Sequence, residues 1–189
     1  TCSYLELSGQ NYLSVPSSTN ASLLDEYTIS TWVYPHADPA TGQHYTGYKA
    51  IASKGQNYQL KLNNGKVYWW WGGGDRELQS STTVELDTWT HVAITYKNGE
   101  QKLYLNGSLD SSHTSTESLN TSDKPVYFGA ELDSGGALES DRHFDGLLDE
   151  IRIYETSQTA SEIQADMAVV RPCAAAIDHI LIKHSGSGV

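Results

Sequence analysis

Short segments rich in Tyr, Trp, Val, Ile and Thr recur along the chain, and Gly, Asn, Asp and Ser separate them. Within many of these segments apolar and polar residues alternate, as expected for strands with one face on a core and one toward solvent. Many short strands at close spacing are typical of an antiparallel sandwich or barrel. Eleven strands are predicted, at residues 4–7, 12–15, 27–34, 48–54, 58–62, 66–71, 78–81, 90–97, 101–105, 126–129 and 146–154.

Local signals mark the turns and one helix. The pairs Asn64-Gly65 and Asn98-Gly99 predict two tight hairpins, because Asn and Gly readily adopt the positive φ of such turns. A helix is predicted to begin at Thr159, where Thr159 and Glu162 form a capping box, and to continue to Met167. It is the only convincing helix in the sequence.

The charge balance restricts the class of partner. Twelve Lys and Arg against 23 Asp and Glu give a formal net charge of -11. Such a surface repels phosphate backbones and anionic lipid headgroups, so nucleic acid and membranes are not expected as partners. No stretch reaches the ~18 apolar residues that a membrane-spanning helix needs. Divalent cations are the expected counter-ions, since acidic loops supply the oxygen ligands that Ca²⁺ prefers.

Three consecutive tryptophans after a tyrosine form the most unusual feature of the sequence. Successive side chains of a strand face opposite sides, so Val67, Trp69 and Trp71 share one face. Tyr68 and Trp70 share the other. The first face is predicted to be core because its partner strand is rich in Leu, which leaves the second face to offer flat apolar rings for stacking on sugars.

Three stretches are predicted as exposed loops. Residues 110–123 are rich in Ser and Thr, and residues 131–145 carry Gly and acidic residues. The loop at residues 35–47 is long enough to border a binding groove, so His44 and Tyr45 are predicted ligand contacts beside the outward aromatics. In the alternative interpretation, this loop covers the outward aromatics and both faces of their strand are buried.

Two cysteines lie near opposite ends of the patterned region, Cys2 and Cys173. A disulfide between them would tie the first strand to the segment after the helix and would indicate an oxidising compartment, outside the cell or in the periplasm. The alternative is a pair of free buried thiols. Residues 174–189 hold a further apolar run and are interpreted as a linker and the truncated start of a following domain.

Three segments carry a family pattern in order and spacing: residues 27–35 (YTISTWVYP), residues 89–107 (WTHVAITY leading to LYLNG) and residues 144–154 (FDGLLDEIRIY). Together they resemble the laminin-G-like family, which shares its jelly-roll fold with concanavalin A-like lectins and glucanases. The resemblance implies an all-β antiparallel sandwich over residues 1–173 with one short C-terminal helix. Because the family includes binders of glycans, proteins and steroids, it restricts function only loosely.

The resemblance also implies a calcium site. Asp149 is similar to the Asp that binds a structural Ca²⁺ in related jelly-roll glucanases, where main-chain carbonyls, here those of Ser8 and Gly9, complete the site. In the alternative interpretation Asp149 only pairs with a neighbouring Lys or Arg. A rival calcium position is the acidic loop at the rim of the sandwich, which carries Asp133, Ser134, Glu139 and Asp141. In the alternative interpretation, this acidic loop only keeps the surface soluble.

Catalytic motifs are missing from the sequence. Related glucanases place two carboxylates on a Glu-x-Asp-x-Glu strand, and the nearest approaches here are Glu131-Leu132-Asp133 and Asp149-Glu150. The sequence has no nucleophile elbow, phosphate loop or zinc signature. A non-catalytic module is therefore expected.

A second resemblance lies at the C-terminal junction, in Arg171-Pro172-Cys173-Ala174, Ile177-Asp178-His179 and residues 185–188. It resembles the junction in bacterial surface proteins related to the biogenesis protein of the mannose-sensitive haemagglutinin pilus. The expected function is a calcium-stabilised extracellular adhesion module for glycans or cell-surface proteins. The alternative is a protein-interaction or spacer domain in pilus assembly, with pilus components as partners. A glycan-cleaving enzyme is the least favoured hypothesis.

Overall fold

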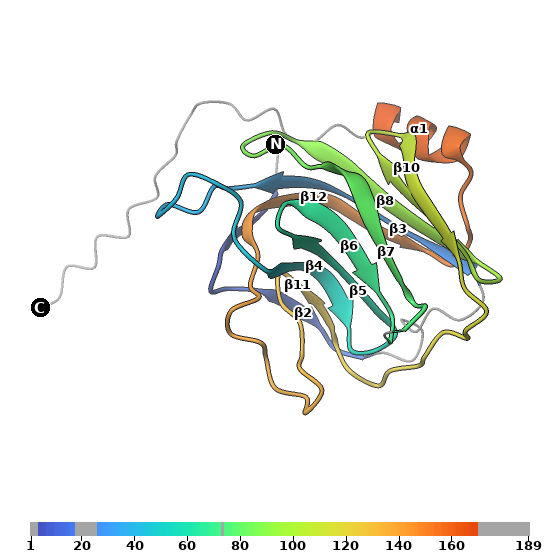
Figure 1. Ribbon diagram of the computed structural model, residues 1–189, viewed down its shortest axis with the longest axis horizontal. Coiled ribbons are helices and arrows are strands. Elements are labelled where there is room, and N and C mark those ends of the chain that lie inside the picture. The colour runs from blue at the N-terminus through green and yellow to red at the C-terminus, as the bar shows by residue number, and fades with distance from the viewer. Residues whose placement is uncertain (1–3, 18–25, 73, 170–189) are drawn as a thin grey trace, which may run out of the picture.

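The computed structural model describes residues 4–17, 26–72 and 74–169, which form two antiparallel sheets packed face to face (Figure 1). The strand order is β1-β12-β3-β8-β9-β10 in the first sheet and β2-β11-β4-β5-β6-β7 in the second. This confirms the predicted all-β jelly-roll sandwich. The elements are β1 (Leu5–Ser8), β2 (Leu13–Val15), β3 (Glu26–Pro35), β4 (Tyr48–Lys54), β5 (Tyr58–Asn63), β6 (Lys66–Trp70), β7 (Glu77–Thr83), β8 (Thr90–Lys97), β9 (Glu100–Leu105), β10 (Ser108–Thr114), β11 (Val126–Phe128), β12 (Asp145–Tyr154) and α1 (Ala160–Val169).

Each of the eleven predicted strands overlaps an observed one, and β10 is the strand that the sequence prediction missed. The predicted loop at residues 110–123 was wrong over its first part, because residues up to Thr114 pair with β9. The strand lies at the edge of its sheet and most of its side chains are exposed or half-buried. Its Ser-rich composition therefore gives no apolar alternation. The useful signal was Asn106-Gly107, which forms a tight turn like the two predicted ones.

Both predicted hairpins are confirmed. Asn64 and Gly65 have φ of 49° and 80°, and Asn98 and Gly99 have φ of 50° and 85°. Two successive positive φ values match the twist of an antiparallel ribbon, which explains why Asn-Gly connects β5 to β6 and β8 to β9. At Gly99 an added Cβ would lie 2.1 Å from the carbonyl oxygen of Ser115, so this turn also requires a residue without a side chain.

The core between the sheets is largely aromatic. Val67, Trp69 and Trp71 are fully buried, which confirms the predicted inward face of β6. Trp69 and Trp71 lie with ring centroids 4.9 Å apart, and both contact Tyr96. Because these rings fill the interior, the alternate residues of β5 and β6 are directed to the opposite side of the second sheet.

Polar contacts join two sheet edges. The carboxylate of Asp110 on β10 accepts hydrogen bonds from the backbone N–H groups of Ser81 and Thr82 on β7, at 2.6 and 3.1 Å. The edge of the first sheet is thus attached to the edge of the second. This contact closes one side of the sandwich and occupies backbone donors that an edge strand otherwise presents.

The helix α1 packs on the outer face of the first sheet (Figure 1). Its predicted capping box is present, with Thr159 N–H donating to Glu162 at 2.7 Å and the Glu162 N–H donating to Thr159 Oγ1 at 3.3 Å. Ile163 is fully buried against Ala93 and Tyr104. No helix in the described part of the chain is long and apolar enough to cross a membrane. Cys2, Cys173 and the tail at 174–189 lie outside the described residues, so the disulfide and the following domain stay predictions.

Candidate functional site

A groove lies over the outer face of the second sheet. Its floor follows from strand parity, since Tyr68 and Trp70 on β6 face away from the core and pair across the sheet with Lys61 and Gln59 on β5. The cavity measures about 710 Å³, within the range of small-molecule sites. Its walls are a turn and two loops, residues 55–56, 121–124 and 132–142, of which the last contains the acidic rim loop predicted as a metal site.

The rim loop is folded back on itself. Its backbone closes through hydrogen bonds from Glu139 N–H to Glu131 oxygen at 3.0 Å and from Asp133 N–H to Ala137 oxygen at 2.7 Å. Asp133 Oδ1 also accepts from the N–H groups of Gly135 and Ala137, each at 2.8 Å. These hydrogen bonds fix the conformation of the loop at the edge of the groove.

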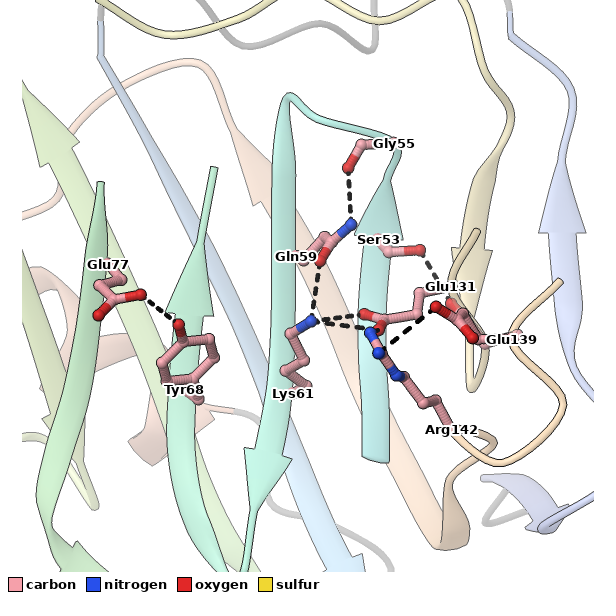
Figure 2. Close-up of polar contacts among 10 residues, drawn as sticks. Ser53, Gly55, Gln59, Lys61, Tyr68, Glu77, Glu131, Glu139 and Arg142 are labelled. Carbon is pink, nitrogen blue, oxygen red and sulfur yellow. Dashed lines mark hydrogen bonds and ion pairs between the residues drawn. The ribbon is translucent and has the colours of Figure 1, made fainter. Parts of the chain in front are cut away.

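A buried ionic network lies under the groove (Figure 2). Lys61 Nζ donates to both oxygens of Glu131, at 3.1 and 2.9 Å, and to Gln59 Oε1 at 2.8 Å. Arg142 donates to Glu131 Oε1 at 2.6 Å and its other terminal nitrogen lies 3.4 Å from Glu139. Glu131 is fully buried, and Lys61 is 3% exposed. Each buried charge thus has an opposite charge in contact, as burial requires.

Three aromatic rings surround the Lys61 ammonium. Nζ lies 4.6 Å from the ring centroid of Tyr48 and 5.9 Å from those of Tyr68 and Trp70. Tyr48 and Tyr68 contact each other with centroids 5.1 Å apart. The cation lies within the distance at which ring faces attract positive charge, so it helps to hold the three rings in place. Tyr48, Tyr68 and Trp70 are half-buried and line the groove.

Burial shifts the ionisation of two floor residues. Removal from water lowers the pKa of Lys61, and the attraction of Glu131 opposes this shift. Burial raises the pKa of Tyr68, as does the hydrogen bond from its hydroxyl to Glu77. Tyr68 therefore stays neutral at ordinary pH, and its ring remains an apolar contact surface.

The four predicted ligand residues do not form one site. Tyr68 and Trp70 line the groove, but His44 and Tyr45 line a separate cavity of about 10 Å³. His44 Nε2 contacts the Val84 carbonyl at 2.7 Å, and Tyr45 donates to an Asp145 oxygen at 3.0 Å. The structure therefore does not place His44 and Tyr45 beside the outward aromatics, and their role as ligand contacts stays a prediction.

The first predicted calcium site is not assembled. Ser8 pairs with Asp145 on β12, four positions from Asp149, so the strand register does not bring Asp149 together with Ser8 and Gly9. Asp149 Oδ1 accepts from the Glu150 N–H at 2.9 Å. The carboxylate beside Gly9 is that of Asp145, which lies 2.9 Å from His36 and also accepts from Tyr45.

The rim residues do not converge on a cation position either. Asp133 accepts from loop N–H groups, Glu139 contacts Arg142, and Asp141 is exposed with its carbonyl oxygen accepting from Lys49 at 2.5 Å. Among the described residues, no three His, Cys, Asp or Glu side chains gather into a group that could hold a metal ion. The present arrangement therefore does not fit a Ca²⁺ ion at either position, and calcium stays a prediction from sequence.

Three important residues were absent from the predicted site: Tyr48, Glu131 and Arg142. Glu131 follows the apolar stretch from Val126 to Ala130, and a lone charge at the end of such a stretch is a usable signal for a buried ion pair. Arg142 and Tyr48 carry no comparable signal. Arg142 lies in a loop that meets Glu131 only in the folded chain, and Tyr48 begins β4, where a register shift between Ala50 and Ala52 interrupts the alternation of faces.

The comparisons with known proteins agree with this architecture. A laminin-G family model described as the concanavalin A-like lectin/glucanases superfamily matches residues 7–164. The chain belongs to this superfamily. No curated protein matches it in sequence.

Three solved structures show how the superfamily fold is used elsewhere. Domain 4 of the extracellular arabinanase AbnA from Geobacillus stearothermophilus, solved with arabinotriose, is 23% identical with a TM-score of 0.64, covering 87% of this chain and 80% of that one. The botulinum neurotoxin serotype D ligand binding domain, solved with N-acetylneuraminic acid, is 18% identical with a TM-score of 0.65, covering 88% and 41%. The binding domain of botulinum neurotoxin DC, solved with rat synaptotagmin II, is 13% identical with a TM-score of 0.62, covering 84% and 40%. This chain spans less than half of either toxin domain.

Proposed function

We propose that this chain is a non-catalytic glycan-binding module whose ligand lies in the groove over β4, β5 and β6. The observation that carries the proposal is the groove floor, where Tyr48, Tyr68 and Trp70 present ring surface beside the fixed polar groups of Gln59 and Asp133. Sugars have apolar C–H faces and hydroxyl edges, so a site for them needs both kinds of surface. A concave site with aromatic lining and few polar groups meets that need.

The carboxylates near the groove support binding rather than hydrolysis. Glycoside hydrolysis needs one carboxylic acid that can give a proton and a second carboxylate that acts on the sugar. Both oxygens of Glu131 accept from Lys61, and one also accepts from Arg142. Asp133 lies on the exposed loop above. An arabinanase domain of the same fold is solved with arabinotriose, and a toxin ligand binding domain of the same fold is solved with N-acetylneuraminic acid, which supports a glycan-binding role here.

Protein binding is the second candidate. One toxin domain of this fold is solved with synaptotagmin II. In this chain three apolar side chains on and beside the edge strand β2 are exposed by 42–45%, and they could meet a protein surface: Tyr12, Leu13 and Val15. An interaction or spacer role in pilus assembly would use such a surface. In either role the setting that we propose is extracellular or on a bacterial surface.

Substitution of Trp70 tests the glycan proposal. Trp70→Ala removes a half-buried ring, and burial of its remaining exposed surface by a ligand would contribute about 1–2 kcal/mol, so affinity should fall by about fivefold or more in a glycan array and in titration calorimetry. Trp89→Ala is the matched control, since Trp89 is equally half-buried and does not line the groove. Equal melting temperatures of each variant and the parent would show that folding is intact.

Two results would contradict the proposal. A broad array on which the parent protein binds no glycan would remove the lectin role and favour protein binding. Glycan binding that survives Trp70→Ala and is lost in Trp89→Ala would place the ligand on another face.

A structural calcium ion is a separate proposal from the sequence, for which neither predicted position is assembled in the structure, and it has its own test. A Ca²⁺ present at 100 times its dissociation constant adds about 2.7 kcal/mol to the free energy of unfolding. Melting temperature with EDTA and with added CaCl₂ measures this directly. An unchanged melting temperature would remove calcium from the account.

A further inference from the structure

Charges of both signs line the groove in equal number. The cations are Lys61, Lys124 and Arg142, and the carboxylates are Asp123, Asp133 and Glu139. Glu131 lies buried directly beneath and adds a further negative charge. The site therefore has no excess of positive charge with which to attract an anion, in a chain whose net charge is -11.

The two floor cations already have anionic partners. Lys61 has three N–H donors, and its three hydrogen bonds go to Gln59 and to both oxygens of Glu131. In Arg142 each terminal nitrogen faces a carboxylate, one of Glu131 and one of Glu139. An acidic ligand would have to displace the fully buried Glu131 to reach Lys61, which would leave that carboxylate unpaired, and it would meet Glu139 beside the partly exposed Arg142.

The third cation is a weak anchor. Lys124 Nζ lies 3.7 Å from Asp123, and the Lys124 side chain is 49% exposed. A charge in that position is screened by water and salt. It would contribute little to the capture of a carboxylate.

Two exposed carboxylates at the groove wall keep acceptor atoms available to a ligand. Asp133 is exposed, and within the described residues no donor contacts its Oδ2 atom. Asp123 is also exposed beside the groove. Carboxylate oxygens accept hydrogen bonds from sugar hydroxyls and repel other anions.

We infer that the groove selects uncharged oligosaccharides and discriminates against glycans that carry carboxylate or sulfate groups. This inference rests on the proposed function and adds the class of ligand to it. The selectivity comes from the internal neutralisation of Lys61 and Arg142 by Glu131 and Glu139, together with the exposed carboxylate of Asp133. The ligand class inferred here differs from the ligand of one toxin domain of this fold, which was solved with a sialic acid.

Paired glycans test the inference. The probes are sialylated oligosaccharides with their desialylated forms, and uronic-acid oligomers with neutral oligomers of the same linkage. We expect each neutral form to bind about tenfold more tightly than its acidic partner at low salt, because like charges would meet at the wall, and we expect the ratio to shrink as salt rises.

Two variants locate the cause. Asp133→Asn keeps the oxygen that caps the loop and removes the charge, so the neutral-to-acidic ratio should fall by about threefold or more. Glu155→Gln is the control, because Glu155 is exposed just after β12 and its substitution removes the same charge away from the groove. Its ratio should equal that of the parent protein.

The outcomes separate this inference from the proposed function. Acidic glycans that bind as tightly as neutral ones or more tightly, with loss in Trp70→Ala, would overturn the selectivity and leave the glycan role intact. An unchanged ratio in Asp133→Asn would also overturn it. Binding of no glycan in either class would refute the proposed function itself.

Discussion

Substitution of Glu131 by Gln should destabilise the fold far more than any exposed charge change. Glu131 is fully buried and accepts three charge-assisted hydrogen bonds, two from Lys61 and one from Arg142. Gln has nearly the same shape but no charge, so Lys61 loses its counter-ion and Arg142 keeps only its longer contact with Glu139. Loss of one member of a buried ion pair costs roughly 3–5 kcal/mol, a large part of the ~5–15 kcal/mol stability of a typical domain.

The chain provides a matched control in Glu117. Its distance to Arg76 is 2.6 Å, the same as that from Glu131 to Arg142, but the Glu117 side chain is 49% exposed. Exposed pairs contribute about 0–1 kcal/mol, so Glu117→Gln should cost less than about 1 kcal/mol. The two glutamates share a 2.6 Å contact with an arginine, and they differ in burial and in the additional contacts of Glu131 with Lys61.

Equilibrium unfolding in urea, followed by the fluorescence of the five tryptophans, measures both free energies. A double variant, Lys61→Met with Glu131→Gln, should recover part of the loss because one unpaired cation is gone. If Glu131→Gln costs no more than Glu117→Gln, the floor cations do not depend on Glu131. The reasoning about their neutralisation would then fail.

Three further predictions concern residues of the sandwich that do not line the groove. Burial lowers the pKa of His91 to about 4 from an ordinary 6.5, so between these values the unfolded chain binds a proton that the folded chain does not. The free energy of unfolding should be highest above pH 6.5 and should fall by about 3 kcal/mol as the pH drops to 4. In the variant His91→Gln, the urea midpoint should depend less on pH. Asp110→Ala should cost about 1–2 kcal/mol and speed hydrogen exchange at Ser81 and Thr82, whereas unchanged exchange would show that the contact does not protect this edge. Gly99→Ala should lower the melting temperature through a loss of at least about 1 kcal/mol, because the new Cβ meets a carbonyl oxygen, and an unchanged melting temperature would contradict this steric argument.

Sequence reasoning predicted the sandwich because alternation of side chains is a local property. For β6 and the following Trp71, parity and the Leu residues of the partner strand together placed Trp69 and Trp71 inside and Trp70 outside, and the structure agrees. The same reasoning fails for an edge strand such as β10, which has few buried side chains to reveal its period. Polar edge strands and polar loops are therefore difficult to tell apart by composition.

The candidate site was only partly predictable from the sequence, because the positions of several of its residues depend on long-range strand register and on the paths of loops. The expectation for Asp149 required β1 and β12 to pair in a register that places Ser8 beside it, but the observed pairing places Asp145 there. His44 and Tyr45 were assigned to the groove because their loop is long enough to border one, and the structure places both side chains at a separate small cavity. Arg142 meets Glu131 only because the rim loop folds back on itself.

Because the rim loop folds back on itself, the residues that form the groove wall can vary in sequence while the sheet beneath them stays the same. Glu131 and Arg142 anchor its two ends to the floor, while the residues between them contribute chiefly to the wall. Changes of length or sequence at residues 133–138 should alter which sugars fit without disturbing the anchors, as insertions in surface loops commonly do. The same scaffold could thus acquire new specificities through exchange of one short segment, in natural divergence or in a library made for that purpose.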